Sequence, residues 1–180
     1  MIVTRTALEE VVLLTPEIHS DDRGWLLEAW NERALKSAGV DARFLQENQL
    51  HSTRNVLRGL HYQLQKPQGK LVRVLSGEIF DVAVDLRKSS PTFGRSVAST
   101  LASAEHQSIW IPPGFAHGYL VLSEVATVLY SVTDYWAPEY ERILAWNDPA
   151  LAIAWPLFNP PILSSKDASG VPFAMAEVYP

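Results

Sequence analysis

The sequence contains no cysteine, which excludes disulfide bonds, thiolate metal sites and a cysteine nucleophile. It also lacks excess positive charge, because 15 basic and 20 acidic residues give a net charge of -5 with no basic footprint for nucleic acid or an anionic membrane. The first ten residues include Arg5, Glu9 and Glu10, so no apolar run there has the length of a signal peptide or membrane span. We therefore expect a cytoplasmic protein without nucleic-acid or membrane partners.

The length and composition predict one globular domain. A chain of 180 residues with 47% hydrophobic content can bury one sizeable core. No repeat, low-complexity tract or linker divides it. We expect a single domain spanning residues 1–180.

Short apolar runs rich in Val, Ile, Leu, Trp and Tyr recur along the chain between turn-forming residues. Strands at such close spacing are typical of a β-sandwich or barrel rather than of βαβ units. The dipeptide Ser76-Gly77 predicts a hairpin between two of these runs, whereas KSSPTFG (88–94) predicts a longer loop. The runs are FLQENQLH (44–51), NVLRGLHYQ (55–63), KLVRVLS (70–76), EIFDVAVDL (78–86), RSVASTL (95–101), QSIWIP (107–112), HGYLVLS (117–123) and TVLYSVTDYW (127–136).

Helical signals are few. Asn31 is a candidate N-cap, ERALKSA follows it, and Gly39 is a stop signal, so we expect one short surface helix there. Prolines recur from Pro149 to Pro172 and would interrupt long regular elements. The C-terminal part is therefore expected to be an irregular wrap with one short helix.

Two of the five histidines are candidates for chemistry. His19, His51 and His106 have polar neighbours near expected turns and are interpreted as surface residues, whereas His61 and His117 lie among apolar residues close to glycines. In IPPGFAHGYL (111–120), residues Pro112, Gly114 and His117 match the Pro-x-Gly-x-x-His pattern of the second cupin motif. A Pro-Gly turn before such a strand would direct its histidine into a small barrel.

The first cupin motif normally contains a His-x-His pair. The corresponding stretch RGLHYQ (58–63) has His61 but places Gln63 where the second histidine would stand. Replacing a ligand with a neutral amide leaves too few strong donors for a metal, so we expect neither a metal nor any other cofactor. A barrel-facing histidine that binds no metal can still abstract a proton.

With these two motifs and several further strings, the sequence resembles the dTDP-4-dehydrorhamnose 3,5-epimerase family nearly end to end. The matching strings also include DDRGWLLE (21–28), FLQENQ (44–49), QGKLVRVLSGEIFDVAVDLRKSSPTFG (68–94), WIPPGFAHGYLVLSE (110–124), LYSVTDYW (129–136), LAWNDPALAIAWP (144–156) and SSKDA (164–168). The resemblance implies a mainly β fold, a cupin-type jelly-roll barrel with a few short helices. It also implies epimerisation at C-3 and C-5 of dTDP-4-keto-6-deoxy-D-glucose, giving dTDP-4-keto-L-rhamnose.

The resemblance also implies catalytic roles. His61 would be the general base and Asp167 the carboxylate that orients it, an arrangement that fixes the imidazole tautomer and stabilises the imidazolium. Lys70 would lie near the oxygen of the enolate formed beside the ketone, with His117 as a second polar contributor. Tyr130 would return a proton on the opposite face of the sugar.

The remaining family positions concern substrate binding. Arg23 and Arg58 are suited to diphosphate oxygens because a guanidinium presents forked donors. The resemblance assigns contacts with the base and sugar to Glu28, Gln46 and Asn48, while Leu26 stands where many relatives carry an aromatic residue. The N-terminal segment resembles a dimer arm that adds to a neighbour's sheet, so a homodimer is expected.

Three other functions remain open. A relative that inverts only C-3 or only C-5 would use the same residues. A metal-dependent cupin, such as a dioxygenase or a sugar isomerase, is disfavoured by Gln63. A non-catalytic sugar-binding cupin would not need a base, an acid and an enolate stabiliser together.

Overall fold

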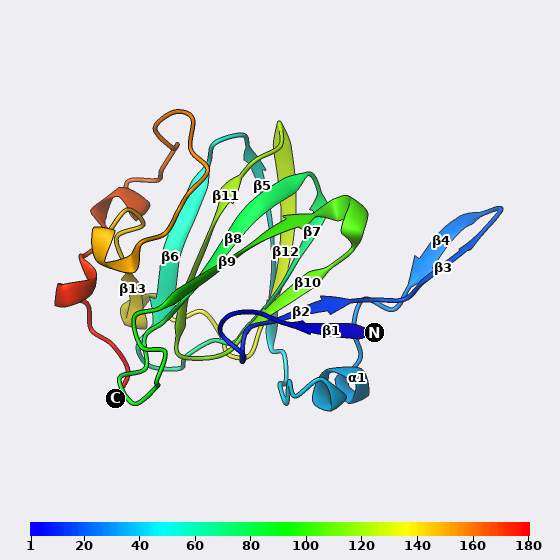
Figure 1. Cartoon of the computed structure of the whole chain (residues 1–180), viewed down its shortest axis with the longest axis horizontal. Helices are drawn as coiled ribbons and strands as arrows, with labels where there is room; N and C mark the ends of the chain where they lie inside the picture. Colours follow the sequence, from blue (N-terminus) through cyan, green and yellow to red (C-terminus); the bar gives the residue numbers. More distant parts are fainter.

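The computed structural model describes residues 1–180 and contains two antiparallel β-sheets that pack face to face (Figure 1). The first sheet has the order β1-β2-β10-β7-β12-β5, the second has the order β13-β6-β11-β8-β9, and β3 pairs only with β4. The strands are β1 (Ile2–Arg5), β2 (Val12–Thr15), β3 (Ile18–Asp21), β4 (Gly24–Leu27), β5 (Gln46–Thr53), β6 (Leu57–Gln63), β7 (Lys70–Ser76), β8 (Glu78–Asp85), β9 (Ser96–Ala102), β10 (Ser108–Ile111), β11 (Phe115–Val121), β12 (Val125–Val132) and β13 (Glu141–Ile143).

The strand predictions for residues 44–136 are confirmed, since each of the eight expected runs overlaps one of the strands from β5 to β12, with ends that differ by a few residues. The structure also contains strands β1 to β4 and the short β13, which the eight runs did not predict. The mainly β fold with a few short helices is confirmed as well. No helix in the structure combines the length and apolar character needed to cross a membrane.

The hairpin predicted at Ser76-Gly77 is wrong. Strand β7 pairs with β10 and β12, whereas β8 pairs with β11 and β9, so the chain passes from one sheet to the other at this turn. Gly77 has φ +82, and a Cβ there would lie 2.1 Å from the carbonyl oxygen of Val125. Glycine is needed at this corner because both the backbone conformation and the space exclude a side chain.

The main core fills the space between the two sheets. Val72 and Val74 of β7 and Val128 of β12 pack there with residues such as Ala83 of β8 and Leu101 of β9. Each fully buried valine or leucine side chain contributes roughly 1.5–3 kcal/mol to the stability of the fold, relative to the same side chain in water. The same inward face of β7 begins with Lys70, so the apolar core gives way to polar side chains at the end of the sandwich where β7 starts.

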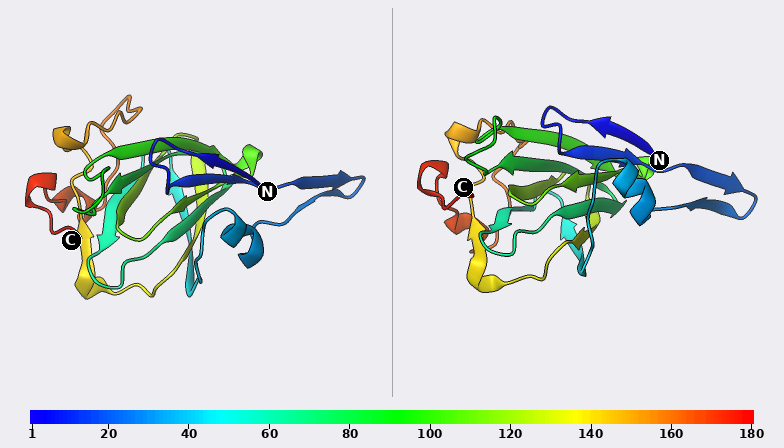
Figure 2. Two further views of the ribbon diagram at one scale, coloured as in Figure 1. Left: turned by 60° about the horizontal axis from the view of Figure 1, so that its bottom comes forward. Right: turned by 90° about the horizontal axis from the view of Figure 1, so that it is seen from below.

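Helix α1 (Glu32–Ser37) confirms the one helix expected in the first half of the chain. The side chain of Asn31 accepts a hydrogen bond from the backbone N–H of Ala34 at 2.7 Å, and Gly39 follows the helix with φ +85. Leu35 of this helix is fully buried among Val12, Leu14, Leu71 and Trp110. Helix α1 therefore covers part of the outer face of the six-stranded sheet (Figure 2).

The C-terminal part is an irregular wrap, as expected, but it carries three short 3₁₀ helices rather than one. These are η3 (Pro149–Leu151), η4 (Asp167–Ser169) and η5 (Phe173–Met175), and the earlier loops contain η1 (Ser103–Glu105) and η2 (Pro138–Tyr140). At the other end of the chain, the β3–β4 hairpin projects from the body of the molecule (Figure 1).

Candidate active site

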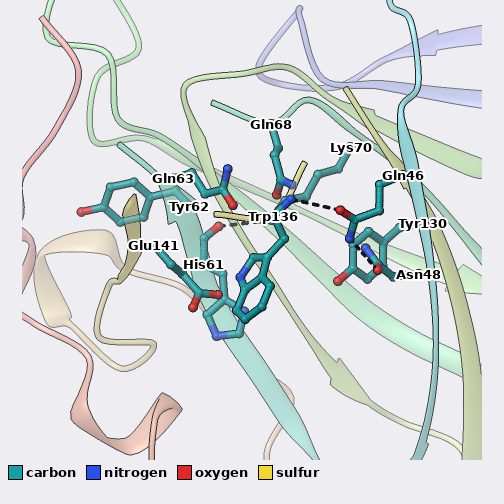
Figure 3. A pocket seen from close by; sticks show the side chains of 10 residues that line it. All are labelled: Gln46, Asn48, His61, Tyr62, Gln63, Gln68, Lys70, Tyr130, Trp136 and Glu141. Carbon is teal, nitrogen blue, oxygen red and sulfur yellow. Dashed lines mark hydrogen bonds between the residues drawn. The ribbon is translucent and has the colours of Figure 1, made fainter. Parts of the chain in front are cut away.

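A cleft lies at the polar end of the sandwich, where side chains from both sheets converge (Figure 3). It consists of two adjoining cavities of about 230 and about 200 Å³. His61 reaches it from β6, whereas Lys70 and Tyr130 reach it from β7 and β12 of the facing sheet. Both cavities are lined by His61, Lys70, Tyr130, Trp136 and Glu141.

His61 is held by a buried carboxylate. Its Nε2 lies 2.5 Å from Oδ1 of Asp167, which begins η4 and is 4% exposed. Burial alone would raise the pKa of Asp167, but hydrogen bonds from His61, Ser164 and Gly59 outweigh it and lower the pKa to about 2. The ionised carboxylate accepts the Nε2 proton of His61, so Nδ1 carries the lone pair that can accept a proton.

The local structure requires a glycine at position 59, two residues before His61. Gly59 has φ +111, and a Cβ there would lie 2.6 Å from the carbonyl oxygen of His117 on the neighbouring strand β11. Its backbone N–H donates to Oδ1 of Asp167 at 3.1 Å. Glycine thus permits the close approach of β6 to β11 and supplies one of the donors that keep Asp167 ionised.

Lys70 and His117 line one wall of the cleft, and both are almost fully buried. The ammonium of Lys70 donates to the backbone oxygen of His61 at 3.2 Å, and burial lowers the pKa of Lys70 to about 8 although the nearby Asp81 opposes this. His117 Nε2 lies 2.8 Å from Oδ2 of Asp81, and burial lowers the pKa of His117 against the same opposing charge. Near neutral pH, the wall therefore presents a charged lysine beside a neutral histidine.

Tyr130 projects into the cleft from the six-stranded sheet. Burial raises its pKa, although the guanidinium of Arg58 and a hydrogen bond with Asn48 partly oppose that shift. The phenol is therefore protonated near neutral pH and can donate its proton. Arg58 itself is fixed by a hydrogen bond of 3.0 Å from its Nε to Oγ of Ser52.

Most of the residues singled out in the sequence come together in or directly behind this cleft. They are His61, Asp167, Lys70, Tyr130, His117, Arg58, Gln46 and Asn48. Arg23 and Glu28 do not: Arg23 lies on the projecting hairpin with 90% of its side chain exposed and pairs with Asp21, and Glu28 binds Asn31. Within one chain, neither residue forms a hydrogen bond or ion pair with a residue that lines the cleft.

Several residues of the site were not identified from the sequence, among them Asp81, Trp136 and Glu141. Asp81 could have been noticed, because a carboxylate within the apolar run EIFDVAVDL (78–86) is unusual. In the structure this side chain is fully buried. Trp136 and Glu141 gave no signal, because Trp136 ends an aromatic run expected to form a strand and Glu141 begins the short strand β13, which was not predicted. Glu141 lines the cleft and binds Lys166, the neighbour of Asp167 in sequence.

Gln63, at the second metal-ligand position of the cupin motif, is buried and fully engaged with the protein. Its amide nitrogen donates to the backbone oxygens of Lys66 and Tyr135, and its oxygen accepts from the backbone N–H of Ala137. No group of three or more His, Asp or Glu side chains is arranged to hold a metal ion. A metal-free reaction nevertheless stays a prediction.

Comparisons with known proteins point to one family. The model of the dTDP-4-dehydrorhamnose 3,5-epimerase family matches residues 5–175. A dTDP-4-dehydrorhamnose 3,5-epimerase from Pseudomonas aeruginosa is 52% identical over 181 residues, covering 100% of both chains.

Two solved structures are similar to nearly the whole chain. One is dTDP-6-deoxy-D-glucose-3,5-epimerase from Legionella pneumophila in complex with dTDP-4-keto-L-rhamnose, with a TM-score of 0.94, 45% identity and coverage of 98% of this chain and 94% of that one. The other is a 3'-monoepimerase from Streptomyces bikiniensis in complex with dTDP-quinovose, with a TM-score of 0.88, 32% identity and coverage of 94% and 87%.

Proposed function

The chain belongs to the dTDP-4-dehydrorhamnose 3,5-epimerase family, and on that premise we propose that it inverts C-3 and C-5 of dTDP-4-keto-6-deoxy-D-glucose to give dTDP-4-keto-L-rhamnose. The observation that carries the proposal is the placement of His61 and Tyr130 on opposite sides of one cleft (Figure 3). Inversion requires a proton to leave from one face of the sugar carbon and another to arrive on the other face. A base and an acid on facing sheets meet this requirement.

His61 is the base. Its Nδ1 accepts the proton from the carbon beside the C-4 ketone while Nε2–H remains bonded to Asp167. The C–H electron pair moves into the ring and toward the carbonyl oxygen, which becomes an enolate. The charge of Asp167 stabilises the imidazolium that forms, as in other histidine–aspartate pairs.

Lys70 stabilises the enolate. The developing negative charge on the oxygen requires a positive group or donors in a site from which water is largely excluded. Lys70 is 7% exposed and mostly protonated at neutral pH, and the neutral His117 lies beside it as a further polar group. Because an ion interacts more strongly in such surroundings than in water, this ammonium contributes more than an exposed lysine would.

Tyr130 is the acid. Its phenol donates a proton to the enolate carbon from the side opposite His61, which inverts the centre. The raised pKa of Tyr130 keeps the proton in place until the enolate forms. Arg58, close enough to influence that pKa, stabilises the phenolate that results and is also suited to a diphosphate oxygen.

The nucleotide end of the site requires a second copy of the chain in this proposal. The β3–β4 hairpin exposes Trp25 and Leu26 to solvent, with 57% and 69% of each residue accessible, and Arg23 forms part of the same hairpin. In a homodimer, the hairpin of one protomer would reach the cleft of its partner and bring Arg23 and Glu28 to the nucleotide, while Gln46 and Asn48 contribute from the cleft itself. A cytoplasmic location stays a prediction.

The reaction is tested by incubating the purified chain with dTDP-4-keto-6-deoxy-D-glucose in heavy water and following C-3 and C-5 by NMR. Both carbons should gain deuterium and invert. Deuterium and inversion at one carbon alone would indicate a single-centre epimerase. Absence of both, with folded protein and intact substrate, would contradict the proposal.

The dimer is tested by mixing two inactive variants. His61→Asn removes the base from one cleft and Arg23→Ala disables one hairpin, so a mixed dimer with hairpins exchanged contains one site in which both groups are intact. Activity should recover on mixing and subunit exchange. If the mixture stays as inactive as its components, or light scattering gives a monomer, the hairpin does not act on a partner.

A further inference from the structure

Three glutamine side chains bind the backbone of four consecutive residues, 134 to 137, between β12 and η2. Gln68 donates to the carbonyl oxygen of Asp134 at 2.9 Å, and Gln63 donates to that of Tyr135 at 3.2 Å. The N–H of Trp136 donates to Oε1 of Gln46 at 3.0 Å, and the N–H of Ala137 donates to Oε1 of Gln63 at 2.8 Å. The three glutamines come from different segments, since Gln46 belongs to β5, Gln63 to β6 and Gln68 to the loop before β7.

Gln63 is the central member of this group. It is 3% exposed, and both of its N–H donors are occupied by backbone oxygens, because it also donates to Lys66 at 2.9 Å. An amide has only two N–H donors, so Gln63 has none left for a ligand although it lines the cleft. A buried amide that is fully engaged with backbone groups fixes the position of those groups.

The segment that the glutamines hold carries Trp136 at the centre of the cleft. Trp136 lines both cavities, and Figure 3 shows its ring near those of His61 and Tyr130. The residue is 54% exposed, so packing alone does not fix the ring. The ammonium of Lys166 lies 5.9 Å from the centroid of this ring. The hydrogen bonds to the backbone of residues 134–137 are therefore the main constraint on where the ring lies.

We propose that Gln46, Gln63 and Gln68 form a glutamine clamp that positions Trp136 as the wall against which the sugar ring is held between His61 and Tyr130. Within the clamp, the three glutamines are positioning residues that act through Trp136, and Gln46 also contributes to the nucleotide end of the site. This inference rests on the proposed function. It also gives a physical reason for glutamine at the second ligand position of the cupin motif: the side chain orders the cleft instead of holding an ion.

A double-mutant cycle tests the proposal. Gln63→Leu keeps most of the side-chain volume and removes every hydrogen bond of the amide, and Trp136→Ala removes the ring. Gln63→Leu should lower kcat/KM by about tenfold to hundredfold, the loss expected when reacting groups are displaced by about 1 Å. Because the clamp acts through the ring, Gln63→Leu should cause little further loss in the Trp136→Ala background. Losses that multiply in the double variant would overturn the proposal.

Tyr179→Phe is the matched control. The Tyr179 hydroxyl donates to the backbone oxygen of Gln63 at 2.5 Å, so this variant also loses a hydrogen bond to Gln63 but leaves the amide in place. It should lower the melting temperature without changing kcat or KM. If Gln63→Leu does not fold, Gln68→Leu removes a single bond at a less buried position and enters the same cycle.

Amide hydrogen exchange tests the clamp without any substrate. In wild-type protein, the N–H groups of Trp136 and Ala137 should be protected, and Gln63→Leu should accelerate exchange at Ala137 at least tenfold while the amides of β11 keep their protection. Unchanged exchange at Ala137 would overturn the clamp, whatever the enzyme's activity. An inactive wild-type protein with the expected exchange pattern would instead contradict the proposed function and leave the clamp standing.

Discussion

The charge of Lys70 should set the alkaline limit of the reaction. Burial lowers the pKa of Lys70 from 10.5 to about 8, so the ammonium that stabilises the enolate is present below pH 8 and is lost as the pH rises through that value. With this pKa, about nine-tenths of the protein carries the charge at pH 7, about one-tenth at pH 9 and about one-hundredth at pH 10. Since kcat/KM reports the free enzyme, it should fall about tenfold per pH unit above pH 8.

The measurement is kcat/KM from pH 6 to pH 10, with circular dichroism at each pH to show that the protein stays folded. Lys70→Arg is the informative variant, because its guanidinium remains charged over this range. Its rate should be lower, since the larger group fits the wall less well, but the decline near pH 8 should be absent. Loss of the Tyr130 proton cannot produce that decline, because burial raises the pKa of Tyr130 above its ordinary value of 10.

Two results would refute this account of Lys70. One is a profile that stays flat to pH 9.5, which would mean that the charge of Lys70 is not used. The other is a decline near pH 8 that survives in Lys70→Arg, which would assign the titration to another group.

Three further predictions concern the His61–Asp167 pair and the expected independence of the reaction from metal ions. His61→Asn should abolish both deuterium exchange and inversion, since an amide cannot accept a proton at neutral pH; wild-type turnover would remove His61 from the mechanism. Asp167→Asn should lower kcat by a smaller factor, at most about 10⁴-fold, because the orienting charge is lost but the imidazole remains. An unchanged rate would leave Asp167 a purely structural residue. Excess EDTA should leave activity intact, because no step requires a metal, and loss that zinc or iron restores would favour a metal-dependent enzyme.

Strands β5 to β12 were predictable because each forms part of a short apolar run, and each of the eight runs between residues 44 and 136 overlaps one of them. Which strands pair was not predictable from local signals. Ser76-Gly77 marks a sharp turn in either case, but only the strand pairings show that β7 and β8 belong to different sheets. Turn residues report backbone geometry, and pairing depends on contacts far away in sequence.

The active site was likewise only partly predictable from the sequence. His61 and Asp167 are 106 positions apart, and no periodicity or spacing connects them, so their pairing came from resemblance alone before the structure placed them 2.5 Å apart. Gln63 was correctly identified as a departure from the metal motif, but its three partners are backbone groups that carry no sequence signal. Trp136 is held in the cleft through hydrogen bonds to its backbone segment, which also carry no sequence signal, so it could not have been found from the sequence.

The central claim is that base and acid act from opposite faces, and Tyr130→Phe tests it most directly. The variant keeps the ring and its packing but loses the phenolic proton, so folding should change little. His61 can still remove a proton and return one from its own side. Measured in heavy water by NMR, the ratio of deuterium exchange to inversion should therefore rise well above that of the wild type. If exchange and inversion fall in strict proportion, Tyr130 contributes to forming the enolate and is not the opposite-face acid.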